Sequence, residues 1–206
     1  MVLCITAVGK FYTDTVSKFI TKDFSKKFDI HILTDKPELY PNYNTDLYYK
    51  STFNFFDKIS YGFTVIDKLQ KSGFIIDADD LCKFEKIYSS FDLSSKYIQV
   101  LGYWDERGTL NNNDTKHINF WRFMKNYLKN NNISENNIYM VLESMFFLPK
   151  LNYKHFLKYF ESLRFLFEKN SRENEMWKGS VGNGEGVAVG YAFFRSKLLH
   201  KKIKIK

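Results

Sequence analysis

Three carboxylates follow one short apolar run in this chain of 206 residues: Asp77, Asp79 and Asp80 come directly after Phe74-Ile75-Ile76. An Asp-x-Asp pair occurs often by chance, so its place in the chain carries the information. Ligands of open α/β sheets bind outside the carboxyl ends of the strands, which is where this motif falls. Alternation along an extended chain points Asp77 and Asp79 to the same side. Such a pair predicts a site for Mn²⁺ or Mg²⁺, and the alternative is a set of solvated loop carboxylates or helix N-caps.

A fourth carboxylate, Glu185, lies in a glycine-rich segment and is followed by the apolar residues Val187-Ala188-Val189. Glycine-rich loops can close over a substrate. A carboxylate beside a reacting carbon can serve as a base, a nucleophile or a stabiliser of positive charge. Glu185 is therefore the candidate catalytic residue, and the other interpretation is a helix-start Glu favoured by the macrodipole.

Two more residues are candidates for contacts with a substrate. Trp177 lies in the same glycine-rich segment, where it either stacks on a ring of the substrate or belongs to the core. Glu143 interrupts the apolar run Tyr139–Phe147, so it is either a residue at the edge of a strand or a buried acceptor-binding group.

Apolar strands and amphipathic helices must position these residues, and their patterns alternate along the first half of the chain. The expected strands there are Val2–Val8, Phe28–Leu33, Asp46–Tyr49 and Phe74–Ile76, and the expected helices are Thr13–Lys26 and Asn54–Gln70. In the second half the expected strands are Lys96–Tyr103 and Ile138–Phe147, and the expected helices are Ile118–Lys129, Tyr153–Glu168 and Glu185–Leu199. This order predicts an α/β domain with a mixed, mostly parallel central sheet flanked by helices.

The composition is that of one globular domain, with 44% hydrophobic and 26% charged residues. No apolar run approaches the ~20 residues of a membrane span, and the beginning of the chain lacks the charged region of a signal peptide. The two cysteines, Cys4 and Cys82, have no metal-ligand spacing. These features predict a cytoplasmic protein and exclude a transmembrane protein, a coiled coil and a zinc ribbon.

Three segments of the first 80 residues resemble a known family. They are Thr6-Ala7-Val8-Gly9-Lys10-Phe11-Tyr12, the segment 28–37 with its ending Thr34-Asp35-Lys36-Pro37, and Asp77-Ala78-Asp79. Together they resemble glycosyltransferases of the GT-A fold, whose signature is an Asp-x-Asp that ends the fourth strand of a nucleotide-binding sheet. Within that class they are most similar to the retaining family 6, which includes the blood-group A and B enzymes and the α-1,3-galactosyltransferases.

The resemblance implies one GT-A domain with a Rossmann-like nucleotide-binding half (1–80), an acceptor and catalytic half (81–195) and a basic tail (196–206). It implies a UDP-sugar donor, with the metal and the diphosphate held by Asp77 and Asp79 and with Asp80 assisting through the sugar or the ribose. The expected activity is transfer of a hexose or N-acetylhexosamine to a glycan or lipid-linked acceptor. The donor sugar and the stereochemistry stay open.

The remaining site residues implied by the resemblance come from three places in the chain. Contacts with the uridine fall on Thr6, Ala7, Val8 and Tyr12, where Tyr12 either stacks on the base or packs on the sheet. Lys58 is the nearest cation on the helix before the metal motif, and its alternative is a solvated surface lysine. Glu185 falls where the family keeps a catalytic Glu.

The net charge of +8 leaves other partners open. A basic, aromatic-rich chain can bind nucleic acid without catalysis, although its basic residues are interleaved with acids rather than striped. A sugar-1-phosphate nucleotidyltransferase is a further alternative, but its glycine-rich, Arg-bearing first loop has no counterpart here. We expect no nucleic-acid partner, and we expect the lysines of the segment 196–206 to allow peripheral contact with the inner face of an anionic membrane.

Overall fold

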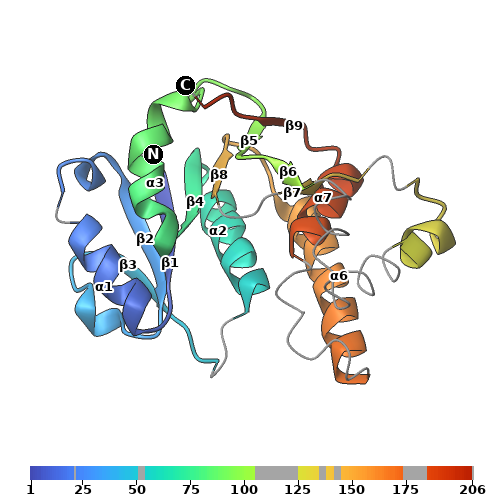
Figure 1. The fold of residues 1–206 in the computed structure, drawn as a ribbon, viewed down its shortest axis with the longest axis horizontal. Coiled ribbons are helices and arrows are strands. Elements are labelled where there is room, and N and C mark those ends of the chain that lie inside the picture. The colour runs from blue at the N-terminus through green and yellow to red at the C-terminus, as the bar shows by residue number, and fades with distance from the viewer. Residues whose placement is uncertain are drawn as a thin grey trace.

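A seven-stranded sheet runs through the middle of the molecule, with helices on both of its faces (Figure 1). The computed structural model describes residues 1–20, 22–50, 54–104, 125–134, 138–141, 145–173 and 185–205. The strands of the large sheet are β1 (Val2–Ala7), β2 (Asp29–Thr34), β3 (Asn44–Leu47), β4 (Gly73–Asp77), β5 (Ile98–Val100), β8 (Met145–Leu148) and β9 (His200–Lys202). A separate two-stranded sheet joins β6 (Tyr103–Trp104) to β7 (Met140–Val141).

The order of the strands in the large sheet is β3-β2-β1-β4-β8-β5-β9. Every neighbouring pair is parallel except the two that involve β8, which is antiparallel to both β4 and β5. The chain therefore builds outward from β1 to β2 and β3 and then returns to the other side of β1 with β4. The carboxyl ends of β1 and β4 meet at this reversal, the position where open α/β sheets bind ligands.

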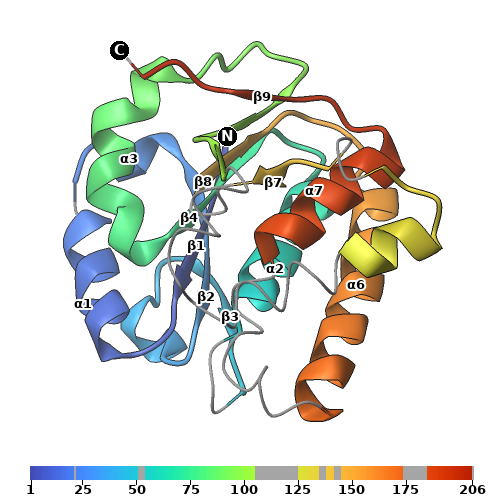
Figure 2. The same cartoon turned by 45° about the vertical axis from the view of Figure 1, so that its right-hand side comes forward.

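The helices divide into two layers, as the view in Figure 2 makes plain. One layer contains α1 (Lys10–Phe19) and α3 (Leu81–Ile87), and the other contains α2 (Phe55–Leu69), α6 (Lys154–Glu173) and α7 (Glu185–Ser196). Residues 125–130 are also helical. None of the helices in the described part of the chain is long and apolar enough to cross a membrane.

Each layer encloses its own hydrophobic core. On the α2 side, the rings of Phe63 and Phe156 stack with centroids 3.9 Å apart, and both side chains are fully buried. On the α1 side, Phe74 from β4 packs against Phe84 from α3 at 4.8 Å. Successive residues of β4 alternate between these cores, because side chains of a strand point to opposite faces of the sheet.

The predicted fold class is confirmed at the level of a mixed α/β domain whose central sheet is mostly parallel and is flanked by helices. Helix α2 matches its prediction closely: the Asn54 side chain caps it by accepting a hydrogen bond from Phe56 N at 2.9 Å, and Gln70 ends it in a left-handed conformation. Helix α1 begins three residues earlier than predicted and ends at Phe19. The earlier start reflects Gly9, whose φ of +92° ends β1 and turns the chain directly into the helix.

Two predicted strands are each divided between the two sheets. The run 96–103 contains β5 and the first residue of β6, and the run 138–147 contains β7 and most of β8. Apolar character marks buried strands but does not show where a chain leaves one sheet for another. The segment 196–206 also includes a strand: β9 pairs with β5 in the large sheet, and Ile203 after it is buried.

Candidate metal and nucleotide site

Three aspartates gather at the carboxyl end of β4. Strand β4 ends at Asp77, and the next three residues form a tight 3₁₀ turn, Ala78–Asp80. Ala78 is fully buried and fixes the turn against the sheet. One ligand oxygen from each of Asp77, Asp79 and Asp80 lies within 4.8 Å of the others.

The prediction that strand alternation brings Asp77 and Asp79 together is wrong. Strand alternation does not continue past Asp77, so it cannot place Asp79 on the same side. The 3₁₀ turn bends the chain back after the strand, and in doing so it also brings Asp80 into the group. The cluster is therefore a product of a turn rather than of an extended segment.

Lys58 on α2 approaches this cluster from the other core layer. Its Nζ lies 2.7 Å from Oδ2 of Asp77, and its side chain is 2% exposed. Lys58 and Gly62 share one face of α2, because residues four apart are neighbours on a helix. A Cβ on Gly62 would lie 2.4 Å from the Ile75 side chain, so α2 packs very close to β4 at this point. That close approach brings the Lys58 ammonium into contact with Asp77. The alternative prediction, that Lys58 is a solvated surface lysine, is therefore wrong.

The electrostatics of Asp77 reflect both burial and its neighbours. Burial raises the pKa of its carboxyl from the ordinary 3.8 to about 6, and the negative charges of Asp79 and Asp80 act in the same direction. The ammonium of Lys58 opposes this shift and lowers the pKa. A second cation, Lys83 on α3, lies 3.8 Å from Oδ1 of Asp80. Two ammonium groups thus face three carboxylates.

This donor set fits a divalent cation. Mg²⁺ and Mn²⁺ prefer oxygen ligands, and carboxylates held within a few ångströms of one another supply them. Asp79 is exposed to solvent, whereas Asp77 and Asp80 are partly buried. A cation at this position would therefore have protein oxygens on one side and an open side for a substrate.

The end of β1 borders the cluster. Thr6 pairs with Asp77 in register, Thr6 and Ala7 are buried, and Val8 is partly exposed. The backbone N–H of Gly9 donates a hydrogen bond of 3.0 Å to Oδ1 of Asp35, which follows β2. The structure thus joins the carboxyl ends of β1, β2 and β4 into one edge.

Tyr12 lies one turn into α1 and is partly buried on the α1 side of the sheet. Burial raises the pKa of its phenol, and the charges of Asp79 and Asp77 raise it further. The charges of Asp77 and Asp79 thus act on Tyr12, and its position is compatible both with packing on the sheet and with contact to a ligand.

The described part of the structure does not test the other candidate residues. Glu185 is the first residue of α7, so it begins a helix as one of its two interpretations predicts, but its side chain is not among those described. Glu143 and Trp177 lie outside the described residues. Their roles stay predictions.

Sequence reasoning missed Asp35 and Lys83. Asp35 belongs to the Thr-Asp-x-Pro segment, so that motif was a signal for it, whereas Lys83 is one of many lysines and had none.

Neither protein-family models nor curated proteins give a match to this chain. The fold and the cluster define an α/β protein with a candidate divalent-cation site at the carboxyl edge of a mostly parallel sheet. Any particular activity has to be argued from that site.

Proposed function

We propose that this protein is a metal-dependent glycosyltransferase of the GT-A fold that transfers a hexose or N-acetylhexosamine from a UDP-sugar to a glycan or lipid-linked acceptor. One observation carries the proposal: Asp77, Asp79 and Asp80 converge at the carboxyl end of the fourth strand, beside β1, where the strand order reverses. The order β3-β2-β1-β4 is also that of the first half of a nucleotide-binding sheet.

In this proposal Asp77 and Asp79 hold Mn²⁺ or Mg²⁺, and Asp80 assists. A divalent cation in this position supplies a Lewis acid that neutralises the charge of a leaving diphosphate. Lys58 holds Oδ2 of Asp77 in an ion pair of 2.7 Å. Through this ion pair Lys58 is proposed to position Asp77 as a ligand.

The nucleoside is proposed to bind at the carboxyl end of β1. Thr6, Ala7 and Val8 would offer backbone contacts there, and Tyr12 lies nearby. Sugar transfer also needs a carboxylate at the anomeric carbon, and Glu185 at the start of α7 is the candidate. Glu143 and Trp177 are proposed to contact the acceptor. Contact with an anionic membrane through the lysines of 196–206 stays part of the proposal.

The first test is thermal unfolding with Mn²⁺, with UDP and with both together. A ligand that binds only the folded protein adds about 2.7 kcal/mol of stability at 100 times its Kd. We expect UDP to stabilise the protein only when Mn²⁺ is present. Asp79→Asn should abolish this effect, because Asp79 is exposed and its loss removes a ligand without disturbing the core.

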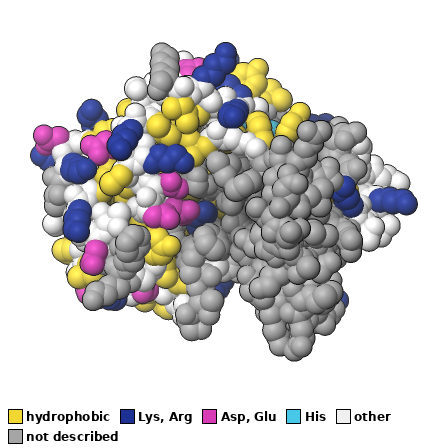
Figure 3. Space-filling model, in the orientation of Figure 1, with side chains coloured by type: hydrophobic (Ala, Val, Ile, Leu, Met, Phe, Trp, Pro, Cys, Tyr) yellow, Lys and Arg dark blue, Asp and Glu magenta, His cyan; other side chains and the backbone are white. Residues whose placement is uncertain are grey.

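Asp23→Asn is the matched control, since Asp23 is an exposed aspartate outside the site. It should retain the full effect of Mn²⁺ and UDP. Absence of stabilisation in the wild type would refute the donor site. Salt-sensitive binding of an oligonucleotide would then favour the basic-surface alternative. The mixture of dark-blue and magenta side chains over the described part of the face in Figure 3 does not form the basic stripe that this alternative needs.

A further inference from the structure

Strand β9 is the outermost strand on one side of the large sheet, and exposed apolar side chains border it. Leu199 and Ile205, which flank β9 in the chain, are 64% and 57% exposed. Tyr139 lies with its ring 5.6 Å from the ring of His200 on β9, and it is more than half exposed. Exposed apolar groups that gather in one place mark a surface that meets a partner.

The charge along β9 has one sign. The segment 196–205 contains Lys197, Lys201, Lys202 and Lys204 and no Asp or Glu. Asp92 lies 3.5 Å from Nζ of Lys201 and offsets one of these four charges. Figure 3 shows hydrophobic and basic side chains near one another along the upper rim of the molecule, where β9 runs in Figure 1. Together the four lysines and the apolar residues Tyr139, Leu199 and Ile205 are called the β9 edge below.

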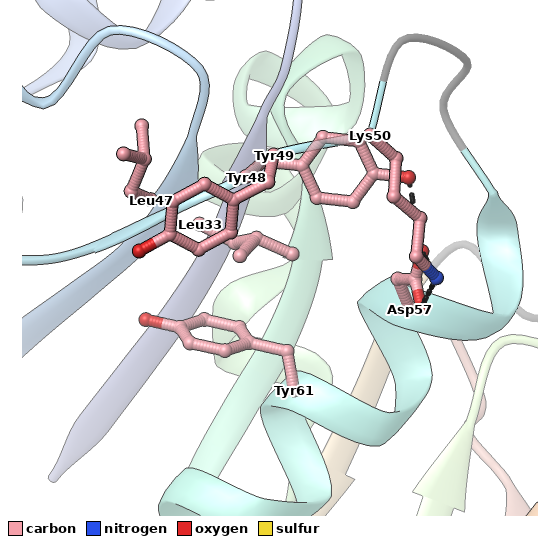
Figure 4. A pocket seen from close by; sticks show the side chains of 7 residues that line it. All are labelled: Leu33, Leu47, Tyr48, Tyr49, Lys50, Asp57 and Tyr61. Carbon is pink, nitrogen blue, oxygen red and sulfur yellow. Dashed lines mark hydrogen bonds and ion pairs between the residues drawn. The ribbon is translucent and has the colours of Figure 1, made fainter.

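The opposite side of the sheet, at β3, also exposes apolar groups but has a different charge. Leu47 and Tyr49 line a hollow of about 280 Å³ beside α2 (Figure 4). Lys50, which also lines the hollow, forms an ion pair of 2.8 Å with Asp57, and Asp46 of β3 is exposed. Carboxylates therefore balance the cation there, whereas the β9 edge keeps an excess of positive charge.

An anionic lipid bilayer fits both properties of the β9 edge. Lysines are attracted to anionic headgroups, tyrosines favour the interface, and exposed leucine and isoleucine side chains can enter the apolar region. A nucleic-acid backbone would match the lysines but would leave Leu199 and Ile205 without an apolar partner. A second copy of the chain would bring the same positive charges together. We propose that the β9 edge docks on an anionic lipid bilayer.

The docked orientation leaves the aspartate cluster open. Strands β8 and β5 separate β4 from β9, and three spacings of ~4.8 Å place β4 about 14 Å from β9. Strands β4 and β9 run in the same direction, because β8 is antiparallel to β4 and β5, and β9 is parallel to β5. The bilayer would therefore lie beside the carboxyl edge of the sheet. In a step that rests on the proposed function, this placement selects a lipid-linked acceptor over a free glycan.

The test is co-sedimentation of the full chain with vesicles of phosphatidylcholine alone or mixed with phosphatidylglycerol. We expect binding to the anionic vesicles only, and weaker binding at high salt. Leu199→Ser should lower the partition coefficient about tenfold. Lys202→Gln combined with Lys204→Gln should lower it about fivefold for each lysine. All three side chains are exposed, so thermal unfolding should show that the variants stay folded.

Matched control variants lie away from β9. Leu39→Ser changes a leucine that is 49% exposed in the turn after β2. Lys26→Gln combined with Lys27→Gln removes two exposed lysines from the turn before β2. Both controls should partition like the wild type.

Three results would overturn the inference. They are equal binding of the wild type to neutral and anionic vesicles, no binding to either, and equal weakening by the test and control variants. Unchanged partitioning of Leu199→Ser would also refute a role for the apolar groups. Vesicle binding needs neither UDP nor Mn²⁺. Failure of the wild type to bind UDP with Mn²⁺ would therefore refute the proposed function and leave the docking surface standing.

Discussion

The ion pair between Lys58 and Asp77 has a measurable consequence for the pH dependence of stability. The folded protein keeps the Asp77 proton up to about pH 6, whereas the unfolded chain loses it near 3.8. The folded state therefore binds more protons between these values, and the free energy of unfolding falls as pH rises through this window. Above about pH 6 this contribution levels off.

Lys58→Met removes the cation that lowers the pKa of Asp77, so that pKa rises above 6 and the loss of stability continues to higher pH. Each pH unit of this continued loss costs about 1.4 kcal/mol. Asp77 of the wild type is half titrated at pH 6, so the wild type loses little more stability above that pH. The difference in free energy of unfolding between wild type and variant should therefore widen by about 1 kcal/mol from pH 6 to 7.

Urea unfolding at several pH values in EDTA measures this gap directly. Lys22→Met is the control, because Lys22 forms an exposed ion pair with Glu85. The difference in free energy of unfolding between this variant and the wild type should be the same at pH 6 and pH 7. A constant gap for Lys58→Met would refute the view that Lys58 keeps Asp77 ionised. An NMR titration of the Asp77 carboxyl in the wild type checks the starting value independently of folding.

Three further predictions concern the packing that holds α2, α6 and α7. Phe63→Ala should cost ~3–5 kcal/mol in urea unfolding, because it empties a fully buried site stacked on Phe156; a cost below 1 kcal/mol would contradict this packing. Arg164→Met should cost about 2 kcal/mol, since it breaks a partly buried pair with Asp57 that joins α6 to α2; an unchanged urea midpoint would count against it. Gly190→Ala should lower the thermal midpoint and cost ~1–3 kcal/mol, because the new Cβ would lie 1.8 Å from the carbonyl oxygen of Tyr139; full stability would show that α7 can move away.

Much of the fold was predictable because its signals are local. Continuous apolar runs marked β1, β2 and β4, and the apolar periodicity of 54–70 marked α2. What could not be predicted was the exchange of chain between sheets, as in the run 138–147, where β7 and β8 look alike in sequence. Their separation depends on pairing with strands that are distant in the chain.

For the site, residue types and a position after an apolar strand were enough to select Asp77, Asp79 and Asp80. The sequence could not show that Lys58 would be buried against Asp77, because the two are 19 residues apart on different elements. Their contact depends on the rotation of α2 about its axis and on the close approach at Gly62.

The sequence by itself determined an α/β domain and a set of carboxylates at a strand end, because hydrophobic periodicity and local motifs are properties of neighbouring residues. The tertiary structure decided which strands lie beside β1 and β4, that a 3₁₀ turn gathers three aspartates, and that β9 becomes an outer strand of the sheet. These features arise only when strands and helices pack in register, so that residues far apart in the chain come within a few ångströms of one another.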